Sequence, residues 1–315
     1  GEAPVILKVA PPSQAEIEAF SEGALVVSFL FPARNLDRVA ALAARKATLF
    51  AMELVPRITK AQKMDALSSQ ANISGYKAVI RAADTLGRYF PLLMTAAGTV
   101  KPARVFIFGA GVAGLQAIAT ARRLGAVVEA TDIRLVVKEQ VESLGARFVM
   151  VEPEGDTQDE GGYAKEASEE YRRKQAALVG KHVAQADVVI TTAQVPGRKA
   201  PVLMPAEMVA TMKPGAVIVD LAADQGGNCA LTQAGRTVVE NGVTILGPVN
   251  LPATVPSHAS ELYARNVLHV VEHLIPEKEV QLDFEDPITG ASVAVHAGEI
   301  RHAPTAEALK STASR

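Results

Sequence analysis

A strand that runs directly into a glycine-rich turn is the feature that most constrains the fold of this chain. Residues 104–114 read RVFIFGAGVAG, and the helical stretch LQAIATARRLG follows. In this G-x-G-x-x-G pattern, Gly109 permits the tight turn, Gly111 lets a pyrophosphate approach the backbone, and Gly114 lets helix and strand pack closely. The helix N-terminus then offers free N–H groups to phosphates. The pattern predicts a dinucleotide site built from Gly109, Gly111, Val112, Ala113 and Gly114.

An acidic residue at the end of the next expected strand favours one of the two nicotinamide dinucleotides. Asp132 lies in EATDIR, close to the distance of about 20 residues at which this pattern carries its acid. A carboxylate there accepts hydrogen bonds from both adenosine ribose hydroxyls and repels a 2′-phosphate. Arg134, two residues further on, could instead accommodate a 2′-phosphate. We therefore expect NAD(H), with Ile133 and Arg134 beside Asp132; a glycine-rich turn without a ligand is the alternative.

Short β-type runs alternate with helical patterns along most of the chain, which predicts an α/β fold with parallel sheets covered on both faces. Two long helical stretches, 58–95 and 256–275, are expected to link two doubly wound Rossmann-like domains with the cofactor in the cleft. The expected domains are residues 1–70 with 276–315, apparently truncated at the N-terminus, and a nucleotide-binding domain over 71–275. The β-type runs are 5–9, 24–31, 104–108, 126–132, 147–151, 186–192, 215–221 and 243–247.

Composition excludes several classes of protein. The 315 residues carry 32 Lys and Arg against 34 Asp and Glu, so no basic face for nucleic acid is expected. A lone cysteine, Cys229, excludes an internal disulfide framework. No apolar run approaches the roughly 20 residues that span a bilayer, and the histidines show no metal-ligand spacing, so we expect a soluble protein without a metal site. Residues 152–170 are acidic and poor in apolar side chains, which predicts an exposed, mobile loop.

Several longer stretches, taken with the glycine turn, resemble one family over nearly the whole chain. The sequence is similar to the NAD(H)-binding component, domain I, of proton-translocating nicotinamide nucleotide transhydrogenase. The stretches that carry the resemblance are MELVPRITKAQKMDALSSQANISGYKAV, the run from YFPLLMTAAG through the glycine turn to EATDIR, GGYAKEASEEYRRKQ, ITTAQVPGRKAPVLM and VDLAADQGGNCALT. They are far more specific than the glycine pattern alone.

The resemblance implies roles for individual residues. Arg57, Asp65 and Ser68 would hold the nicotinamide and its ribose, and Gln62 would sit where the second nucleotide arrives. Residue types of this kind suit the reaction, because hydride transfer between two nicotinamides needs positioning and exclusion of water rather than an acid or a base. From the residues alone, Asp65 and Ser68 could equally cap a helix. The resemblance also assigns nucleotide contacts to a mobile loop and to the end of a later strand, at Gly162, Tyr163, Ala164, Thr192 and Ala193. Ala167 departs from the methionine usual after this tyrosine.

Two other functions remain open. Alanine dehydrogenases resemble the chain over much the same length, with Lys8 at the position of their substrate lysine and Asp224, in DQGG, at that of their catalytic acid. However, Phe31 stands where they carry a histidine, and oxidation of an amine requires a proton acceptor. The third possibility is a regulatory NAD-sensing module without turnover.

The resemblance also implies partners and a location. NADP(H) would be bound by a separate component, and a membrane-spanning component would couple hydride transfer to proton translocation. The chain itself would supply one half of an active site, as a peripheral subunit on the cytoplasmic side of a bacterial inner membrane, and would form a homodimer. The family's chains begin with a further segment that is not found here, so the first domain is expected to be incomplete.

Overall fold

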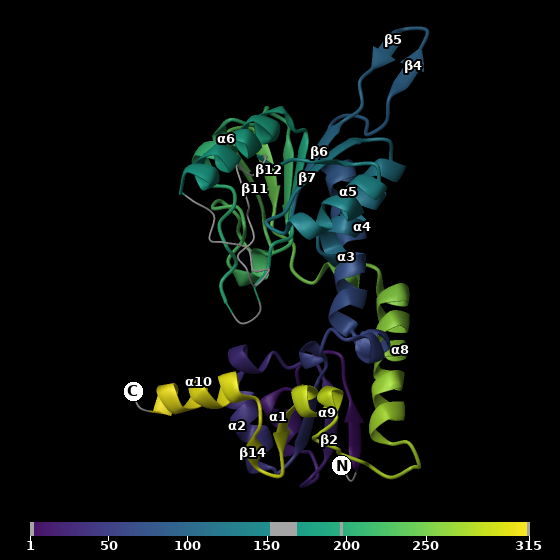
Figure 1. The fold of residues 1–315 in the computed structure, drawn as a ribbon, viewed down its shortest axis with the longest axis vertical. Coiled ribbons are helices and arrows are strands. Elements are labelled where there is room, and N and C mark those ends of the chain that lie inside the picture. Colours follow the sequence, from purple (N-terminus) through teal and green to yellow (C-terminus); the bar gives the residue numbers. More distant parts are fainter. Residues whose placement is uncertain (1–2, 152–168, 196–197, 314–315) are drawn as a thin grey trace, which may run out of the picture. The chain divides into compact units, whose positions relative to one another are not determined.

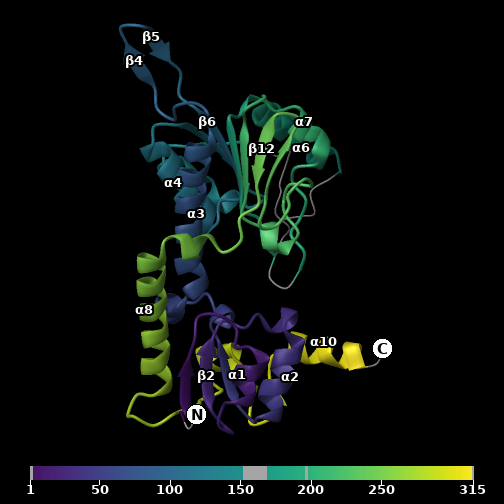
Figure 2. The same ribbon diagram turned by 180° about the vertical axis from the view of Figure 1, so that it is seen from behind.

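The chain forms two compact units, Gly1–Gln70 with Pro256–Arg315 (unit 1) and Ala71–Val255 (unit 2). The computed structural model describes residues 3–151, 169–195 and 198–313. Each unit is a sheet with helices on its faces (Figures 1 and 2). The predicted nucleotide contacts Gly162, Tyr163 and Ala164, and nearly all of the loop predicted at 152–170, lie outside the described residues.

Unit 2 is built on a seven-stranded sheet of order β11-β12-β10-β9-β6-β7-β8. Strands β8, β7, β6, β9, β10 and β12 are mutually parallel, and only β11 runs antiparallel, along β12. This is the strand order 3-2-1-4-5-6 of a dinucleotide-binding fold, with the reversal of direction between β6 and β9. The strands are β6 (Arg104–Phe108), β7 (Val127–Thr131), β8 (Arg147–Phe148), β9 (Val188–Thr191), β10 (Val217–Asp220), β11 (Thr237–Glu240) and β12 (Val243–Leu246).

Helices cover both faces of this sheet, because its central strands are apolar on both sides. On one face, Ile107 and Ile190 join a core with α3 (Ala66–Thr85), α4 (Val112–Arg123) and α5 (Lys138–Ser143). On the other face, Phe106 and Val189 join a second core with α6 (Glu169–Gln185) and α7 (Ala206–Ala210). The alternation of adjacent residues between two cores is what a doubly wound sheet requires, and it confirms the predicted α/β class.

Unit 1 holds a five-stranded sheet of order β1-β2-β3-β13-β14. The first three strands are parallel, and two of them, β1 and β2, lie in the predicted runs 5–9 and 24–31. Strand β3 and the antiparallel strands β13 and β14 are additions that the sequence pattern did not indicate. One face packs on α8 (Pro256–Leu274) and α9 (Pro287–Ser292), the other on α1 (Gln14–Glu18), α2 (Leu36–Ala44) and α10 (Ala303–Ala313). The strands are β1 (Val5–Leu7), β2 (Leu25–Ser28), β3 (Thr48–Ala51), β13 (Val293–His296) and β14 (Glu299–Ile300).

The two long helical stretches differ from their predicted form. The stretch 58–95 begins with a 3₁₀ segment, η3 (Thr59–Met64), followed by α3, because Asp65 caps α3 and interrupts the helix. The prediction is wrong beyond Thr85, where α3 ends, and Leu93–Thr95 form a strand, β4. The stretch 256–275 is helical as α8, but it belongs to unit 1 rather than to the domain predicted over 71–275. The reason is its apolar stripe, in which Tyr263, Val267 and Val270 pack into a core of unit 1.

A separate two-stranded ribbon belongs to unit 2. Strands β4 (Leu93–Thr95) and β5 (Gly98–Val100) pair only with each other, and the ribbon projects from the sheet (Figure 1). Several of its apolar side chains are exposed, with Met94 exposed to 76%, Val100 to 37% and Leu92, just before the ribbon, to 54%. An isolated ribbon of this length buries little apolar surface within itself.

Glu53 holds a left-handed turn in unit 1. Its carboxylate accepts hydrogen bonds from the backbone N–H groups of Leu30 and Phe31, and Phe31 has a φ of 53°. Burial raises the pKa of the Glu53 carboxyl to about 7, against the opposite effect of those hydrogen bonds. The native state therefore favours the protonated form, whereas the unfolded chain ionises near its ordinary value of 4.5.

The stability of unit 1 is expected to fall as the pH rises from 4.5 to 7, since an acid whose pKa is raised on folding loses stabilisation over that interval. The loss should be roughly 3 kcal/mol. Glu53→Gln, which keeps an acceptor oxygen and cannot ionise, should gain about that much relative to the unsubstituted chain between pH 5 and pH 8. Urea unfolding of both proteins at the two pH values measures it; a difference in stability that does not change with pH would refute it.

Candidate functional site

The predicted dinucleotide turn lies at the carboxyl end of β6, beside the point where the strand order reverses. Gly109 has a φ of 92°, and a Cβ there would come 2.5 Å from Thr192 Oγ1. A Cβ at Gly114 would come 1.8 Å from the carbonyl oxygen of Gly109, so only glycine permits this approach of α4 to the turn. The positive φ of Gly109 fits the tight turn predicted for it, and the short distance at Gly114 fits the close packing of helix and strand predicted there.

Gly111 differs from the other two glycines, because a Cβ built there would meet no atom of the described residues within 4 Å. It is the N-cap residue of α4, and no side-chain hydrogen bond caps the helix among those residues. The first N–H groups of a helix lack partners within the helix and carry the positive end of its dipole. Room beside the backbone at the start of this helix is what the approach of a pyrophosphate requires, so the described residues here fit a dinucleotide.

Asp132 follows β7 and lies against the turn, as predicted. Its Oδ2 accepts a hydrogen bond from the Ala110 N–H at 2.7 Å, and its carboxylate forms a salt bridge with Arg134 at 2.9 Å. Burial acts to raise the pKa of Asp132, but the hydrogen bonds from Arg134 and Ala110 outweigh it and hold the pKa below its ordinary value. Asp132 is therefore an ionised acceptor at neutral pH. Ile133 next to it is almost completely exposed.

Thr192 and Ala193 follow β9, the strand on the other side of the reversal point. Thr192 Oγ1 donates to the carbonyl oxygen of Phe108 at 3.0 Å, which ties this segment to the start of the glycine turn. Since the carboxyl ends of β6, β7 and β9 meet at one edge of the sheet, the predicted contacts of unit 2 that the structure describes are brought together there.

Asn228 is a positioning residue that the sequence did not reveal. It is fully buried, accepts a hydrogen bond from Ala193 N–H at 3.0 Å, and donates to the carbonyl oxygens of Ala193 at 2.9 Å and Pro201 at 2.8 Å. One amide therefore holds both polar groups of Ala193. The signal in the sequence was its place after Gly226 and Gly227, and both glycines have left-handed φ values.

Asp220, at the end of β10, holds the segment that contains Asn228 by hydrogen bonds. It is fully buried and accepts hydrogen bonds from Thr191 Oγ1, Thr232 Oγ1 and two backbone N–H groups, those of Ala222 and Cys229, at 2.7–3.0 Å. Four donors satisfy a carboxylate that would otherwise be too costly to bury. Asp220 therefore ties the segment 222–232 to the end of β10 at three points, Ala222, Cys229 and Thr232.

The remaining predicted site residues lie in unit 1, on the segment that precedes α3. Arg57 and Gln62 are exposed, and among the described residues neither side chain makes a hydrogen bond or salt bridge. Ala61 and Met64 are buried and anchor η3, which turns Gln62 outward. The segment thus presents polar side chains on an anchored 3₁₀ turn, an arrangement that suits a polar ligand.

Asp65 and Ser68 cap α3. Asp65 Oδ1 accepts from the Ser68 N–H at 2.8 Å, and Oδ2 accepts from the Ser68 hydroxyl at 2.6 Å. This is the helix-capping role that the residues alone left open. A hydroxyl that donates to Asp65 keeps its lone pairs, so Ser68 can still accept a hydrogen bond from a ligand. The binding role of both residues stays a prediction.

Three positions were compared with alanine dehydrogenases in the sequence, and the structure gives the surroundings of each. Lys8 forms a salt bridge with Glu16, and Phe31 stacks on Phe29 with ring centroids 5.6 Å apart. A phenyl ring in the place of a histidine cannot take a proton from a substrate amine. Asp224 lies in a 3₁₀ turn, η5 (Ala223–Gln225), with an exposed side chain.

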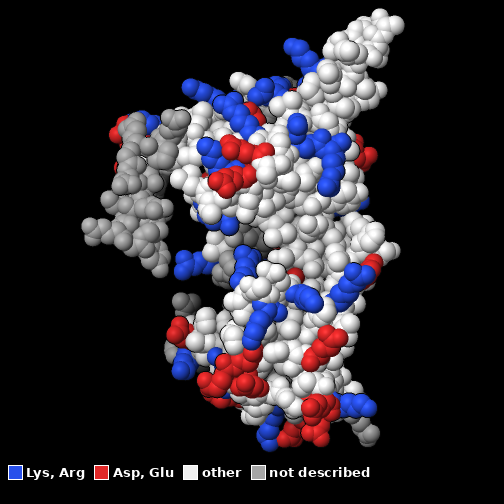
Figure 3. Space-filling view, turned by 45° about the vertical axis from the view of Figure 1, so that its right-hand side comes forward, with Lys and Arg blue, Asp and Glu red and all other residues white. Residues whose placement is uncertain are grey.

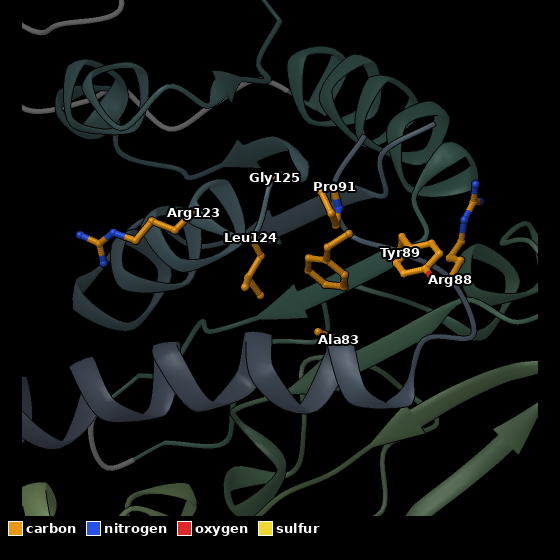
Figure 4. A pocket seen from close by; sticks show the side chains of 8 residues that line it. Ala83, Arg88, Tyr89, Pro91, Arg123, Leu124 and Gly125 are labelled. Carbon is orange, nitrogen blue, oxygen red and sulfur yellow. The ribbon is translucent and has the colours of Figure 1, made fainter. Parts of the chain in front are cut away.

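An open concavity of about 520 Å³ in unit 2 is unrelated to the glycine turn (Figure 4). Its lining includes Leu124 and Gly125, which precede β7 and so lie at the amino edge of the sheet, whereas the turn lies at the carboxyl edge. Arg88 on its rim is already paired with the buried Asp187 at 2.8 Å. The concavity is therefore not a candidate for the dinucleotide site.

The face drawn in Figure 3 carries both positive and negative side chains, because Lys and Arg lie among Asp and Glu there. This agrees with a formal net charge of −2. Among the helices that the structure describes, none is both long and apolar enough to cross a bilayer.

The strand order, the glycine turn and the acid after β7 together define a Rossmann-type α/β protein, with a candidate dinucleotide site in unit 2. Residues 1–74 match the N-terminal domain of the alanine dehydrogenase/PNT family, and residues 78–303 match its C-terminal domain. The chain belongs to this family.

Known relatives fall into two groups. The chain is 49% identical over 310 residues to an NAD(P) transhydrogenase subunit alpha chain of Rhodospirillum rubrum, covering 96% of this chain and 81% of that protein. It is 46% identical to NAD(P) transhydrogenase subunit alpha of Haemophilus influenzae, covering 94% of this chain and 58% of that protein. Identity to alanine dehydrogenase of Halomonas elongata is 28%, over 98% of this chain and 79% of that protein.

Similar solved structures fall into the same two groups of proteins. The crystal structure of transhydrogenase from Sinorhizobium meliloti matches with a TM-score of 0.86 and 49% identity, covering 95% of this chain and 81% of that one. An L-alanine dehydrogenase structure matches with a TM-score of 0.79 and 26% identity, covering 98% and 81%. The chain thus resembles transhydrogenase alpha subunits more closely than these alanine dehydrogenases.

Proposed function

We propose that this chain is the NAD(H)-binding component of a proton-translocating NAD(P) transhydrogenase. It would exchange hydride directly between NAD(H), held at Gly109–Gly114 and Asp132, and NADP(H), held by a partner component. The observation that carries the proposal is the open space before Gly111 with an ionised Asp132 beside it, in a chain 49% identical to a transhydrogenase alpha subunit.

The residues of unit 2 would bind and orient the nucleotide. The α4 N-terminus holds the pyrophosphate, Asp132 accepts from the adenosine ribose, and Thr192 and Ala193 complete the carboxyl edge. The nicotinamide ring, when bound, supplies the hydride. No general acid or base on the protein is needed, since no proton is transferred in this step.

The residues of unit 1 would act on the nicotinamide end. Arg57, Asp65 and Ser68 are proposed to hold the ring and its ribose by hydrogen bonds, and Gln62 to orient the incoming second nucleotide. The contribution of such groups is to hold the two rings at near-attack distance without water between them. Tyr163, with Gly162 and Ala164, is proposed to close over the nucleotide.

The assembly that we propose is a homodimer, peripheral to the membrane on its cytoplasmic side, joined to an NADP(H)-binding component and a membrane-spanning component that moves protons. The exposed apolar ribbon β4–β5 supports contact with another protein chain, because apolar side chains exposed on a projecting ribbon favour association.

An absorbance assay tests the function. Reduction of an NAD analogue by NADPH is followed with this chain alone, with the NADP(H)-binding component alone, and with both together. Turnover that appears only in the mixture supports the proposal. No turnover in the mixture, with amination of pyruvate by ammonia and NADH in this chain alone, would favour an alanine dehydrogenase with Asp224 as its acid. NADH binding without either reaction would favour an NAD-sensing module.

Gln62→Asn is expected to lower the rate of hydride transfer in that mixture by about 10-fold or more, because shortening the side chain by one methylene misplaces the amide. NADH binding should change less than about twofold, since Gln62 is exposed and its side chain makes no hydrogen bond to another described residue. Single-turnover kinetics and a fluorescence titration measure the two effects. Exposed Gln185→Asn at the end of α6 is the matched control. A large loss of NADH binding with normal transfer would contradict the role.

A further inference from the structure

Every acceptor position of the Asp132 carboxylate is already taken by the protein. Oδ1 accepts from Arg134 N–H at 2.8 Å and from Arg134 Nε at 3.0 Å. Oδ2 accepts from Ala110 N–H at 2.7 Å and from Arg134 Nη2 at 2.9 Å. An ionised carboxylate offers about four lone-pair sites, so these four donors saturate it.

A ribose hydroxyl that donates to Asp132 must therefore displace one of these donors. The two backbone donors cannot leave without rebuilding the chain, since Ala110 lies within the glycine turn and Arg134 N–H belongs to the same short turn as Asp132. The guanidinium can leave by rotation about its own side chain. The Arg134 side chain is 51% exposed, whereas that of Asp132 is 6% exposed, so the arginine covers the acid from the solvent side.

We propose that Arg134 is a displaceable cap on Asp132, which competes with the adenosine ribose and thereby sets the selectivity of this site between NADH and NADPH. The inference rests on the proposed binding of NAD(H) at this turn. Because the ribose hydroxyls would replace the hydrogen bonds of the departing guanidinium, the carboxylate would not be left without donors, so the nucleotide can open this ion pair.

The cap acts on the two nucleotides in opposite directions. For NADH, it occupies the acceptors that the ribose hydroxyls need, so it weakens binding. For NADPH, the displaced guanidinium offers a planar set of donors to the 2′-phosphate, which Asp132 alone would repel. Arg134 therefore narrows the preference for NADH that Asp132 creates.

Three variants of the full chain test this, with dissociation constants for NADH and NADPH measured by fluorescence titration at one ionic strength. Arg134→Ala should bind NADH about two- to fivefold more tightly and NADPH several-fold more weakly, so the ratio of the two constants widens by about 10-fold. Arg123→Ala removes an exposed arginine for which no salt bridge is found among the described residues, and it should leave the ratio unchanged. Arg134→Lys keeps the charge but not the planar set of donors. Its ratio of the two dissociation constants should therefore lie between those of the unsubstituted chain and Arg134→Ala.

One result would overturn the proposal that Arg134 caps Asp132: weaker NADH binding in Arg134→Ala while Arg123→Ala is unaffected and both variants unfold normally on heating. Arg134 would then be a direct ligand of the nucleotide. An unchanged ratio would overturn the proposal as well. Asp132→Asn separates this from a failure of the proposed function. If Asp132→Asn binds NADH as the unsubstituted chain does, or if neither binds it, the nucleotide assignment fails and the cap fails with it.

Discussion

Gly114→Ala is expected to abolish measurable NADH binding and to lower the free energy of unfolding of unit 2 by about 3 kcal/mol or more. The new Cβ would lie 1.8 Å from the carbonyl oxygen of Gly109, a backbone atom that no rotation of a side chain can move aside. The N-terminus of α4 must then separate from the turn. That displacement moves the N–H groups that are proposed to hold the pyrophosphate.

Two other glycines serve as controls for that prediction. Gly180 lies on α6, and no atom of the described residues lies within 4 Å of a Cβ built there, so Gly180→Ala should be neutral or should stabilise by up to about 1 kcal/mol. Gly111→Ala should fold normally for the same reason, yet lose NADH affinity, because its open space is the proposed place of the pyrophosphate. Urea unfolding and a fluorescence titration distinguish these cases. A folded Gly114→Ala with unchanged NADH affinity would refute the packing argument.

Asp220→Ala is expected to destabilise unit 2 by about 3–5 kcal/mol, because it leaves two backbone N–H groups and two hydroxyls without their buried acceptor. The segment 222–232 should loosen, and Asn228 would then no longer hold Ala193. We therefore expect NADH binding to weaken along with stability, although Asp220 is not proposed to touch the nucleotide.

Glu240→Ala, at the end of β11 in the same unit, is the matched control for this second prediction. Its side chain is exposed, so its removal should change stability by no more than about 0.5 kcal/mol. Denaturant unfolding with NADH titration at the same protein concentration tests both variants. Equal stability of Asp220→Ala and Glu240→Ala would show that the buried network is not what shapes the segment 222–232.

The sequence located the elements of the site that depend on local geometry. A strand, three glycines at fixed spacing and a helix constrain one another within about ten residues, so the turn at Gly109–Gly114 and the acid at Asp132 could be predicted before any tertiary contact was known. The helical segment 256–275 was equally clear, because its apolar stripe repeats with the helical period.

Residues that act through distant partners could not be predicted in this way. Asn228 and Asp220 are polar residues in a glycine-containing stretch, where solvated turns are usual. Only the fold buries them and gives them Ala193, Thr191 and Thr232 as partners. The pairing of β13 with β3 and the membership of α8 in unit 1 likewise join segments that lie far apart in the sequence.

Asp132 combines a feature that local sequence predicts with one that depends on tertiary contacts. An acid after the second strand of a dinucleotide turn could be predicted from the chain alone, because strand length and turn chemistry are local properties. The occupation of both oxygens of this acid could not, since it depends on where the Ala110 N–H and the Arg134 guanidinium lie in the fold. Local sequence thus predicts where a nucleotide would bind, and tertiary packing supplies the donors that we propose it must displace.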